Sequence, residues 1–405
     1  MMIDAKKILP PGFLIFVLAS CILLFTSELV NHRFWLNDFK VYYLSAKAML
    51  EGQQIYGIPH GLDSGFYKYS PFVLLLYIPF TFLPYQAACI LYYFGIVIAI
   101  LFVFYIIRYF IVKFIIHEAN KHQGWILSVA FVFALNLLYR ELHLGNTNIF
   151  LLLLILMMVK LVSESRFFIA GILFGLILLF KPFFLILAIP LLLHKKQRII
   201  TGAASLFVLQ AVIIIILFGW NTFYFLHAEW IKTMFSHSAS FPSGNNIEYL
   251  VRNFITTNLP ANFSYLLLLA VMLFLIIFFF YKNYATKRRE NKSDDNKNFI
   301  LECFISIAII PSILNTDSEH FLYTLPLILL ITFDVFNRKK PVLFMGLFLL
   351  FLLYGTNSND IVGKTIGDFY DRIGAVGISN LLLIIWGCYL YYANKPGLRN
   401  RIEIL

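Results

Sequence analysis

Long apolar runs recur along the whole chain, and they constrain its fold more than any other feature. They fall at 13–29, 92–107, 199–218, 265–281, 344–354 and 381–392. Several approach the ~20 residues that a helix needs to cross the hydrocarbon of a membrane. Backbone groups in lipid must be hydrogen-bonded within their own segment, so helix is the expected state throughout. Because 60% of the 405 residues are hydrophobic and only 13% are charged, the sequence predicts a polytopic, all-α membrane protein.

The runs predict a single domain, 1–405, containing about 10–12 membrane spans. The simple spans are expected near 11–31, 86–111, 125–139, 147–161, 199–219, 262–282, 299–313, 322–336, 341–355 and 378–393. Residues 167–194 lie between two charged clusters and contain Pro182, which breaks a helix. We therefore expect a hairpin of two short helices with Lys181 near its tip. The segment 71–84 is too short to cross and is bounded by prolines, so it predicts a re-entrant or interfacial helix.

Basic residues predict the orientation of the chain. If the N-terminus is cytoplasmic and alternate loops are assigned to the two sides, the inner loops hold most of the 32 Lys and Arg residues, as the positive-inside rule requires. Both termini are then cytoplasmic, 283–298 is a charged cytoplasmic linker, and 32–85 is the first outer loop. The basic residues form no single stripe, so no nucleic-acid partner is expected. The four cysteines lie in apolar runs and indicate packing, with neither a disulfide framework nor a zinc site.

Polar residues gather in the predicted outer loops. An amphipathic stretch from Asp38 to Glu51 ends at Gly52, a usual helix stop. The helix dipole favours an ionised carboxylate at the start of such a helix, so Asp38 can act as a general base on a hydroxyl. The alternative is that Asn37 or Asp38 only caps the helix.

Three further regions, residues 140–148, Lys181 and His320, offer groups for binding a phosphate or a sugar. Arg140 and His143 can bind a phosphate, and Asn146 and Asn148 can bond sugar hydroxyls, although Asn146 can equally cap a helix. Lys181 stands within an apolar run, where an ionisable residue usually faces a polar cavity. At the outer mouth of a span, His320 can orient a phosphate or carry a proton, or it can be a bonded interfacial residue.

Several enzyme classes lack their signature here. The sequence has no Walker loop, no dinucleotide fingerprint, no His-Glu-x-x-His and no Gly-x-Ser-x-Gly. These absences argue against an ATP-driven pump, a soluble nucleotide-sugar enzyme and a zinc protease. What the sequence offers is a carboxylate, scattered cations and amides on one side of a membrane.

In this setting, an ordered set of short motifs resembles the polytopic glycosyltransferases of the C superfamily, most closely glycosyltransferase family 87, whose mannosyltransferase members use polyprenyl-phosphate mannose. The motifs are Asn37-Asp38-Phe-x-x-Tyr42-Tyr43 with Gly52 and Tyr56, Tyr67-x-Tyr69-Ser70-Pro71, Leu144-Gly145-Asn146-x-Asn148, Ala170-Gly171 to Lys181-Pro182, Lys195-Lys196-Gln-Arg198, and Ser318-Glu-His320 to Leu325-Pro326. They cover roughly residues 30–330. The chain departs from the family at Asn146, where Gln is frequent, and at Ser318-Glu319, where paired histidines or a tryptophan are frequent.

The resemblance implies the fold of these enzymes and an inverting transfer of mannose, or of another hexose or pentose, from a polyprenyl-phosphate donor. The acceptor would be a lipid or glycan on the outer face of a bacterial inner membrane. It implies Asp38 as the catalytic base and His320 near the donor phosphate, with Tyr42 and Tyr69 within the matching motifs. Because the leaving group would be a lipid monophosphate and cations are available, neither a cofactor nor a metal ion is required, although the loops offer enough carboxylates to hold a metal. The alternative function is a flippase or transporter of lipid-linked sugars, although no inverted repeat of the transporter kind is apparent.

Overall fold

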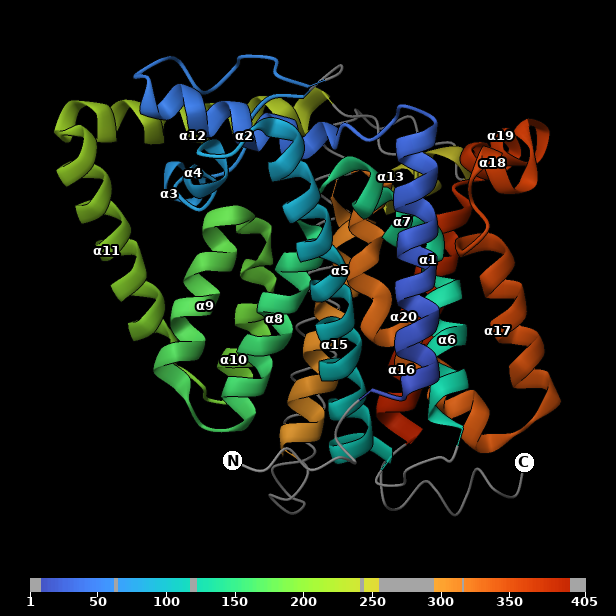
Figure 1. The fold of residues 1–405 in the computed structure, drawn as a ribbon. Coiled ribbons are helices and arrows are strands. Elements are labelled where there is room, and N and C mark those ends of the chain that lie inside the picture. The colour runs from blue at the N-terminus through green and yellow to red at the C-terminus, as the bar shows by residue number, and fades with distance from the viewer. Residues whose placement is uncertain are drawn as a thin grey trace.

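The computed structural model describes residues 9–61, 65–116, 122–240, 244–254, 295–314 and 317–393. Within these ranges the secondary structure is helical, without a β-strand (Figure 1). The fold is therefore the predicted all-α polytopic bundle. In chain order its helices are α1 (Pro11–Val30), α2 (Asn37–Leu50), α3 (Pro71–Leu74), α4 (Ile78–Thr81), α5 (Tyr85–Phe110) with its π-helical extension η2 (Ile111–Ile116), α6 (Gln123–Phe133), α7 (Leu135–Leu144), α8 (Asn148–Ser163), α9 (Phe167–Phe180), the 3₁₀ helix η3 (Pro182–Leu187), α10 (Ala188–Leu193), α11 (Ile199–Phe218), α12 (Trp220–Ser240), α13 (Ile247–Phe254), α15 (Asp295–Ile313), the 3₁₀ helix η5 (Ser318–Thr324), α16 (Leu325–Arg338), α17 (Pro341–Tyr354), α18 (Asn359–Val362), α19 (Lys364–Ile373) and α20 (Ala375–Ala393).

Six described helices are long and apolar enough to cross a membrane: α1, α5 with η2, α11, α15, η5 with α16, and α20. The pair α6 and α7 is bent by 64° and would be a seventh span. Helices α8, α9 and α17 and the segment η3–α10 are apolar but shorter. These helices indicate a multi-pass membrane protein. The span predicted at 262–282 lies outside the described residues, as does the predicted linker up to residue 294; residues 295–298 of that linker are already helical.

The long helices run side by side, and α2 and α12 lie across one end of the bundle (Figure 1). We call this the α2 end. The connections from α10 to α11 and from α16 to α17 lie at the other end. We call it the basic end because these connections contain Lys195, Lys196, Arg198, Lys339 and Lys340. Beyond α11, the described residues up to 254 form α12 and α13.

The hairpin predicted for residues 167–194 is present. α9 ends at Phe180, Lys181 is extended with φ −143° and ψ 96°, and Pro182 begins η3. At the base of this hairpin, His194 Nε2 lies 2.9 Å from Glu302 Oε2 and Lys196 Nζ lies 3.1 Å from Asp295 Oδ2. Tyr391 donates to the other oxygen of Glu302. These bonds join the hairpin to α15 and α20, and they leave Lys181 at the opposite tip.

Small residues allow α9 and α11 to approach closely. A Cβ atom added at Gly171 would lie 2.1 Å from the carbonyl oxygen of Ile199 and 2.9 Å from the Cα atom of Gly202. Gly175, one turn further along α9, faces Ala203 at 3.2 Å in the same way. In lipid, where burial of apolar surface contributes little between helices, such backbone contact is a main source of helix association.

Replacing Gly171 with Ala is therefore expected to lower the stability of the purified protein by about 1–3 kcal/mol, because the added methyl meets backbone that cannot move aside. Gly95→Ala is the matched control, since the nearest atom to its added Cβ is Phe150 Cζ at an ordinary 3.6 Å. Thermal unfolding in detergent measures both variants. Equal midpoints for the two variants would contradict the close α9–α11 contact.

Candidate functional site

Asp38 lies in the first turn of α2, at the end of the bundle that α2 covers. The residue before the helix, Leu36, has a positive φ of 43°, and no side chain caps the helix. The residue at the capping position is therefore Leu36, and Asn37 and Asp38, the two candidates that the sequence left open, are the first two residues of the helix. Gly145, with φ 68°, lies against this turn: a Cβ there would be 2.9 Å from the Cβ atoms of Leu36 and Phe39. Glycine thus lets the α7–α8 corner approach the helix that carries Asp38.

Lys68 is held in the same region by bonds of the neighbouring backbone. The amide of Ser70 donates to the carbonyl of Leu179, near the end of α9, at 3.1 Å. Trp230 of α12 donates through Nε1 to the carbonyl of Lys68 at 3.2 Å. These two bonds position the segment carrying Lys68 between α12 and the end of α9. Lys181 directly follows the last residue of α9.

Asn148, at the start of α8, joins three other elements. Its Oδ1 accepts from Lys181 Nζ at 2.6 Å and from the hydroxyl of Tyr323 at 2.8 Å. Its Nδ2 donates to Glu141 Oε1 at 2.7 Å, and the other oxygen of Glu141 accepts from the backbone amide of Ile149 at 3.1 Å. Glu141 therefore caps α8 from within α7, and Asn148 passes this anchoring on to Lys181. All four side chains are buried.

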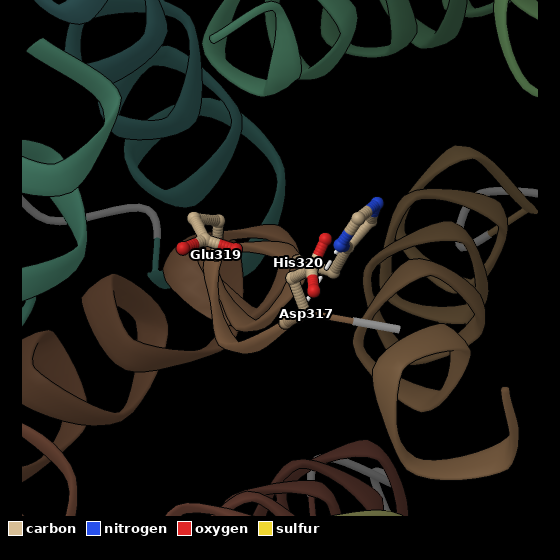
Figure 2. A group of neighbouring side chains, drawn as sticks. All are labelled: Asp317, Glu319 and His320. Carbon is tan, nitrogen blue, oxygen red and sulfur yellow. Dashed lines mark hydrogen bonds between the residues drawn. The ribbon is translucent and has the colours of Figure 1, made fainter. Parts of the chain in front are cut away.

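The start of η5 adds two acids and a histidine to this group (Figure 2). Glu319 accepts a hydrogen bond from Arg140 of α7. His320 Nε2 lies 2.7 Å from Lys181 Nζ, and His320 Nδ1 lies 3.2 Å from the carbonyl of Asp317. A neutral imidazole with its proton on Nδ1 satisfies both contacts, because the ammonium of Lys181 can only donate.

The electrostatics of Asp38 place these charges in one cluster. Burial raises the pKa of Asp38 to about 7, with further raising by Glu319 and Asp317 and opposition from Lys68 and Lys181. Burial also lowers the pKa of Lys68, against the attraction of Asp317, Asp38 and Glu319. We call the groups joined by these charge interactions and by the hydrogen bonds described above the charged cluster. Its members are Asp38, Lys68, Arg140, Glu141, Lys181, Asp317, Glu319 and His320. A carboxylate with a pKa near neutrality is suited to accept a proton.

Asp317, Glu319 and His320 are also the described residues that most resemble a metal site. They are close together in the sequence at the start of η5 (Figure 2), and each has one possible ligand atom within 4.8 Å of those of the other two. Glu319 is paired with Arg140, however, and His320 with Lys181. Two protein cations already neutralise this group, so the donor set fits a metal ion poorly.

The other residues predicted for the site are divided between the cluster and its surroundings. Tyr42 and Tyr69 are buried, their hydroxyls are 3.2 Å apart, and Tyr69 continues to the hydroxyl of Thr147 at 2.8 Å. The charge of Asp38 acts on both tyrosines. His143 instead lies 3.0 Å from Glu28 of α1, and Asn146 accepts from the amide of Thr147.

Lys68, Glu141, Asp317 and Glu319 were missed as site residues by sequence reasoning. Lys68 stands between Tyr67 and Tyr69, which are both buried. Where successive side chains point in alternate directions, that of Lys68 points away from those of the two tyrosines. That alternation was the available signal for Lys68. Glu319 pairs with a residue 179 positions away, and no local pattern indicates such a partner.

Replacing Asn148 with Leu is expected to cost several kcal/mol of stability, because it removes partners from Glu141, Lys181 and Tyr323, and each buried polar group left unpaired costs about 1–3 kcal/mol. Tyr323→Phe, which removes one of these bonds and leaves Asn148 in place, should cost about 1 kcal/mol. Thermal unfolding of the two purified variants makes the comparison. A smaller loss for Asn148→Leu than for Tyr323→Phe would show that Asn148 does not join these elements.

Comparison with known proteins bears on the family. No curated protein matches the chain. The sequence model of glycosyltransferase family 87 matches residues 66–295, more than half of the chain. This match includes Lys68, Arg140, Glu141 and Lys181 of the charged cluster, whereas Asp38 and the η5 residues lie outside it. On this match, the chain belongs to glycosyltransferase family 87.

Proposed function

We propose that this membrane glycosyltransferase moves a sugar, mannose or another hexose or pentose, from a polyprenyl-phosphate donor to a hydroxyl of a lipid or glycan acceptor, with inversion at the sugar carbon. The family supports an enzyme over the alternative of a flippase. One observation carries the donor class and the mechanism: Asp38, with a pKa near neutrality, shares a cluster with Lys68 and Lys181 at one end of the bundle. A base and two ammonium groups are what transfer from a phosphate ester requires.

Asp38 is the proposed general base. With a pKa of about 7, roughly half of the carboxyl groups are ionised at neutral pH and able to accept a proton. Asp38 is half-buried at the start of α2, a helix that lies across the end of the bundle. An acceptor hydroxyl can thus approach it from the water side of the membrane.

The reaction is a single displacement. The acceptor oxygen forms a bond to C1 of the sugar, and its proton passes to Asp38. The bond from C1 to the phosphate oxygen breaks, and its electron pair leaves with the polyprenyl phosphate. Attack and departure take place on opposite faces of C1, so the configuration at this carbon inverts.

Lys68 and Lys181 are proposed to hold the phosphate, whose negative charge grows as the bond breaks. His320, which accepts from Lys181 through Nε2, is proposed to hold this ammonium group toward the phosphate. The side chain of Arg140 is 47% exposed, so its free nitrogen atoms can also reach an anion. With these cations in place, the step requires neither a metal ion nor a cofactor.

The remaining predicted residues have positioning or sugar-binding roles in this proposal. Asn148 has its amide atoms occupied by protein partners, so we assign it to holding Lys181 in place. The paired hydroxyls of Tyr42 and Tyr69 lie near Asp38 and are the groups proposed for sugar hydroxyls. Asn146 is proposed for the same task. His143, which contacts Glu28, is proposed as a more distant phosphate contact.

The proposed orientation follows from the positions of the charges. The basic connections and the charged cluster lie at opposite ends of the bundle. With the basic end in the cytoplasm, as the positive-inside rule requires, the cluster opens to the outer face of the membrane. We propose a bacterial inner membrane, with both termini in the cytoplasm.

Asp38→Asn is expected to reduce sugar transfer about 10²- to 10⁴-fold, the usual contribution of a general base, with donor binding unchanged. Purified protein, labelled polyprenyl-phosphate mannose and a lipid extract as acceptor provide the assay, with other donor sugars tested in parallel. Glu51→Gln is the matched control, because Glu51 is an exposed acid at the far end of the same helix. Equal transfer by Asp38→Asn and wild type would exclude Asp38 as the base.

The rate should also depend on pH in a defined direction. Asp38 acts only when ionised, so kcat/KM is expected to rise about tenfold per pH unit below 7 and to level off above about pH 8. Rates measured from pH 5 to 9 in one buffer mixture provide the profile, with addition of a chelator as a check on metal dependence. A rate that is already level from pH 5 upward, as for an Asp with its ordinary pKa near 4, would contradict the raised pKa of Asp38.

A further inference from the structure

An apolar groove of about 890 Å³ has no lining residue in common with the charged cluster. It is formed by the first turns of α1, by α6, by the end of α16 and by α17. Aromatic rings line much of it, including Phe13, Phe133, Phe348 and Phe351. Its volume lies within the ~300–1,000 Å³ of small-molecule sites.

The groove opens toward the lipid. Trp125 and Phe348, both on its walls, are 72% and 57% exposed. α1 is a candidate membrane span and α17 a shorter apolar helix, so these exposed rings lie on helices suited to contact hydrocarbon. Phe133 and Phe351, whose ring centroids are 5.9 Å apart, line the groove where α6 bends into α7.

The basic end of the groove carries charge. Pro10 and His122 line it there, at the beginnings of α1 and α6. Phe336 and Phe344 also line it, and the chain between them makes the turn from α16 to α17, which contains Lys339 and Lys340. Both lysines are exposed. Figure 1 places this turn and the beginnings of α1 and α6 at the same end of the bundle.

We propose that this groove binds an anionic phospholipid, with one acyl chain among the aromatic rings and the phosphate beside Lys339 and Lys340. Apolar walls that face lipid and end at a basic turn match the two parts of such a molecule. Basic pockets between helices on the cytoplasmic side of membrane proteins recognise anionic headgroups in this way. The site is separate from the proposed transfer reaction and does not depend on it.

Photolabelling of the purified full-length protein tests this site directly. The probe is phosphatidylglycerol with a diazirine at the end of one acyl chain, and labelled peptides are identified by mass spectrometry. Label is expected on Gln123–Phe133 and Pro341–Tyr354, and unlabelled phosphatidylglycerol, but not phosphatidylcholine, should displace it. This comparison uses the wild-type protein alone.

Variants then separate the headgroup from the chain. Lys339→Gln with Lys340→Gln should raise the phosphatidylglycerol concentration for half-maximal labelling roughly 30-fold, whereas Lys47→Gln with Lys364→Gln, two exposed lysines at the α2 end, should not. Ser128→Trp fills the groove and should remove the label, whereas Val208→Trp, on the exposed face of α11, should not.

Three results would overturn the proposal. The first is equal displacement by phosphatidylcholine, which would mean contact with bulk lipid only. The second is label spread over other lipid-facing helices with no response to the two lysine changes. The third is displacement by polyprenyl phosphate but not by phosphatidylglycerol, which would assign the groove to the donor lipid.

Discussion

The contact between Asn148 and Lys181 is the interaction on which the polar part of this structure depends. Burying an ammonium group in an apolar bundle costs free energy unless the group has hydrogen-bond partners. Lys181 is bonded to Asn148 and His320, and Asn148 is in turn fixed by Glu141, which also caps α8. One amide therefore sets the relative positions of α7, α8, η3 and η5. The charged cluster can form only where these four elements meet.

The same demand for partners explains the ends of the bundle. Near the basic end, the buried Glu302 is bonded to His194 and Tyr391, which ties the hairpin to α15 and α20. The bonds at its base and the close packing of α9 on α11 through glycine hold the hairpin in place. The position of Lys181 at its tip is fixed as a result. Lys68 lies on a segment bonded to the end of α9 and to Trp230. In the proposed reaction, these two lysines face the base across the leaving phosphate.

Local signals in the sequence predicted the elements better than their partners. The helix after Asn37 and the hairpin broken at Pro182 follow from amphipathic spacing and proline. The segment 71–84 was predicted as one helix, and the structure has two short ones there, α3 and α4. Helix α12 was not among the elements predicted from the sequence, and polar residues interrupt its apolar ones. Asp38 stood out at the start of an amphipathic helix, and Lys181 stood out as a charge within an apolar run. The ion pair of Arg140 with Glu319 joins α7 to η5, and such pairing is decided by packing that no single segment reveals.

In the proposed reaction, the charged cluster holds the donor phosphate opposite Asp38. The decisive experiment is a structure of the protein with a non-transferable polyprenyl phosphonate sugar. We expect phosphonate oxygens within about 3 Å of the Nζ atoms of Lys68 and Lys181, and C1 of the sugar on the side of Asp38. A phosphonate bound outside the cluster, or a sugar turned away from Asp38, would contradict this proposal.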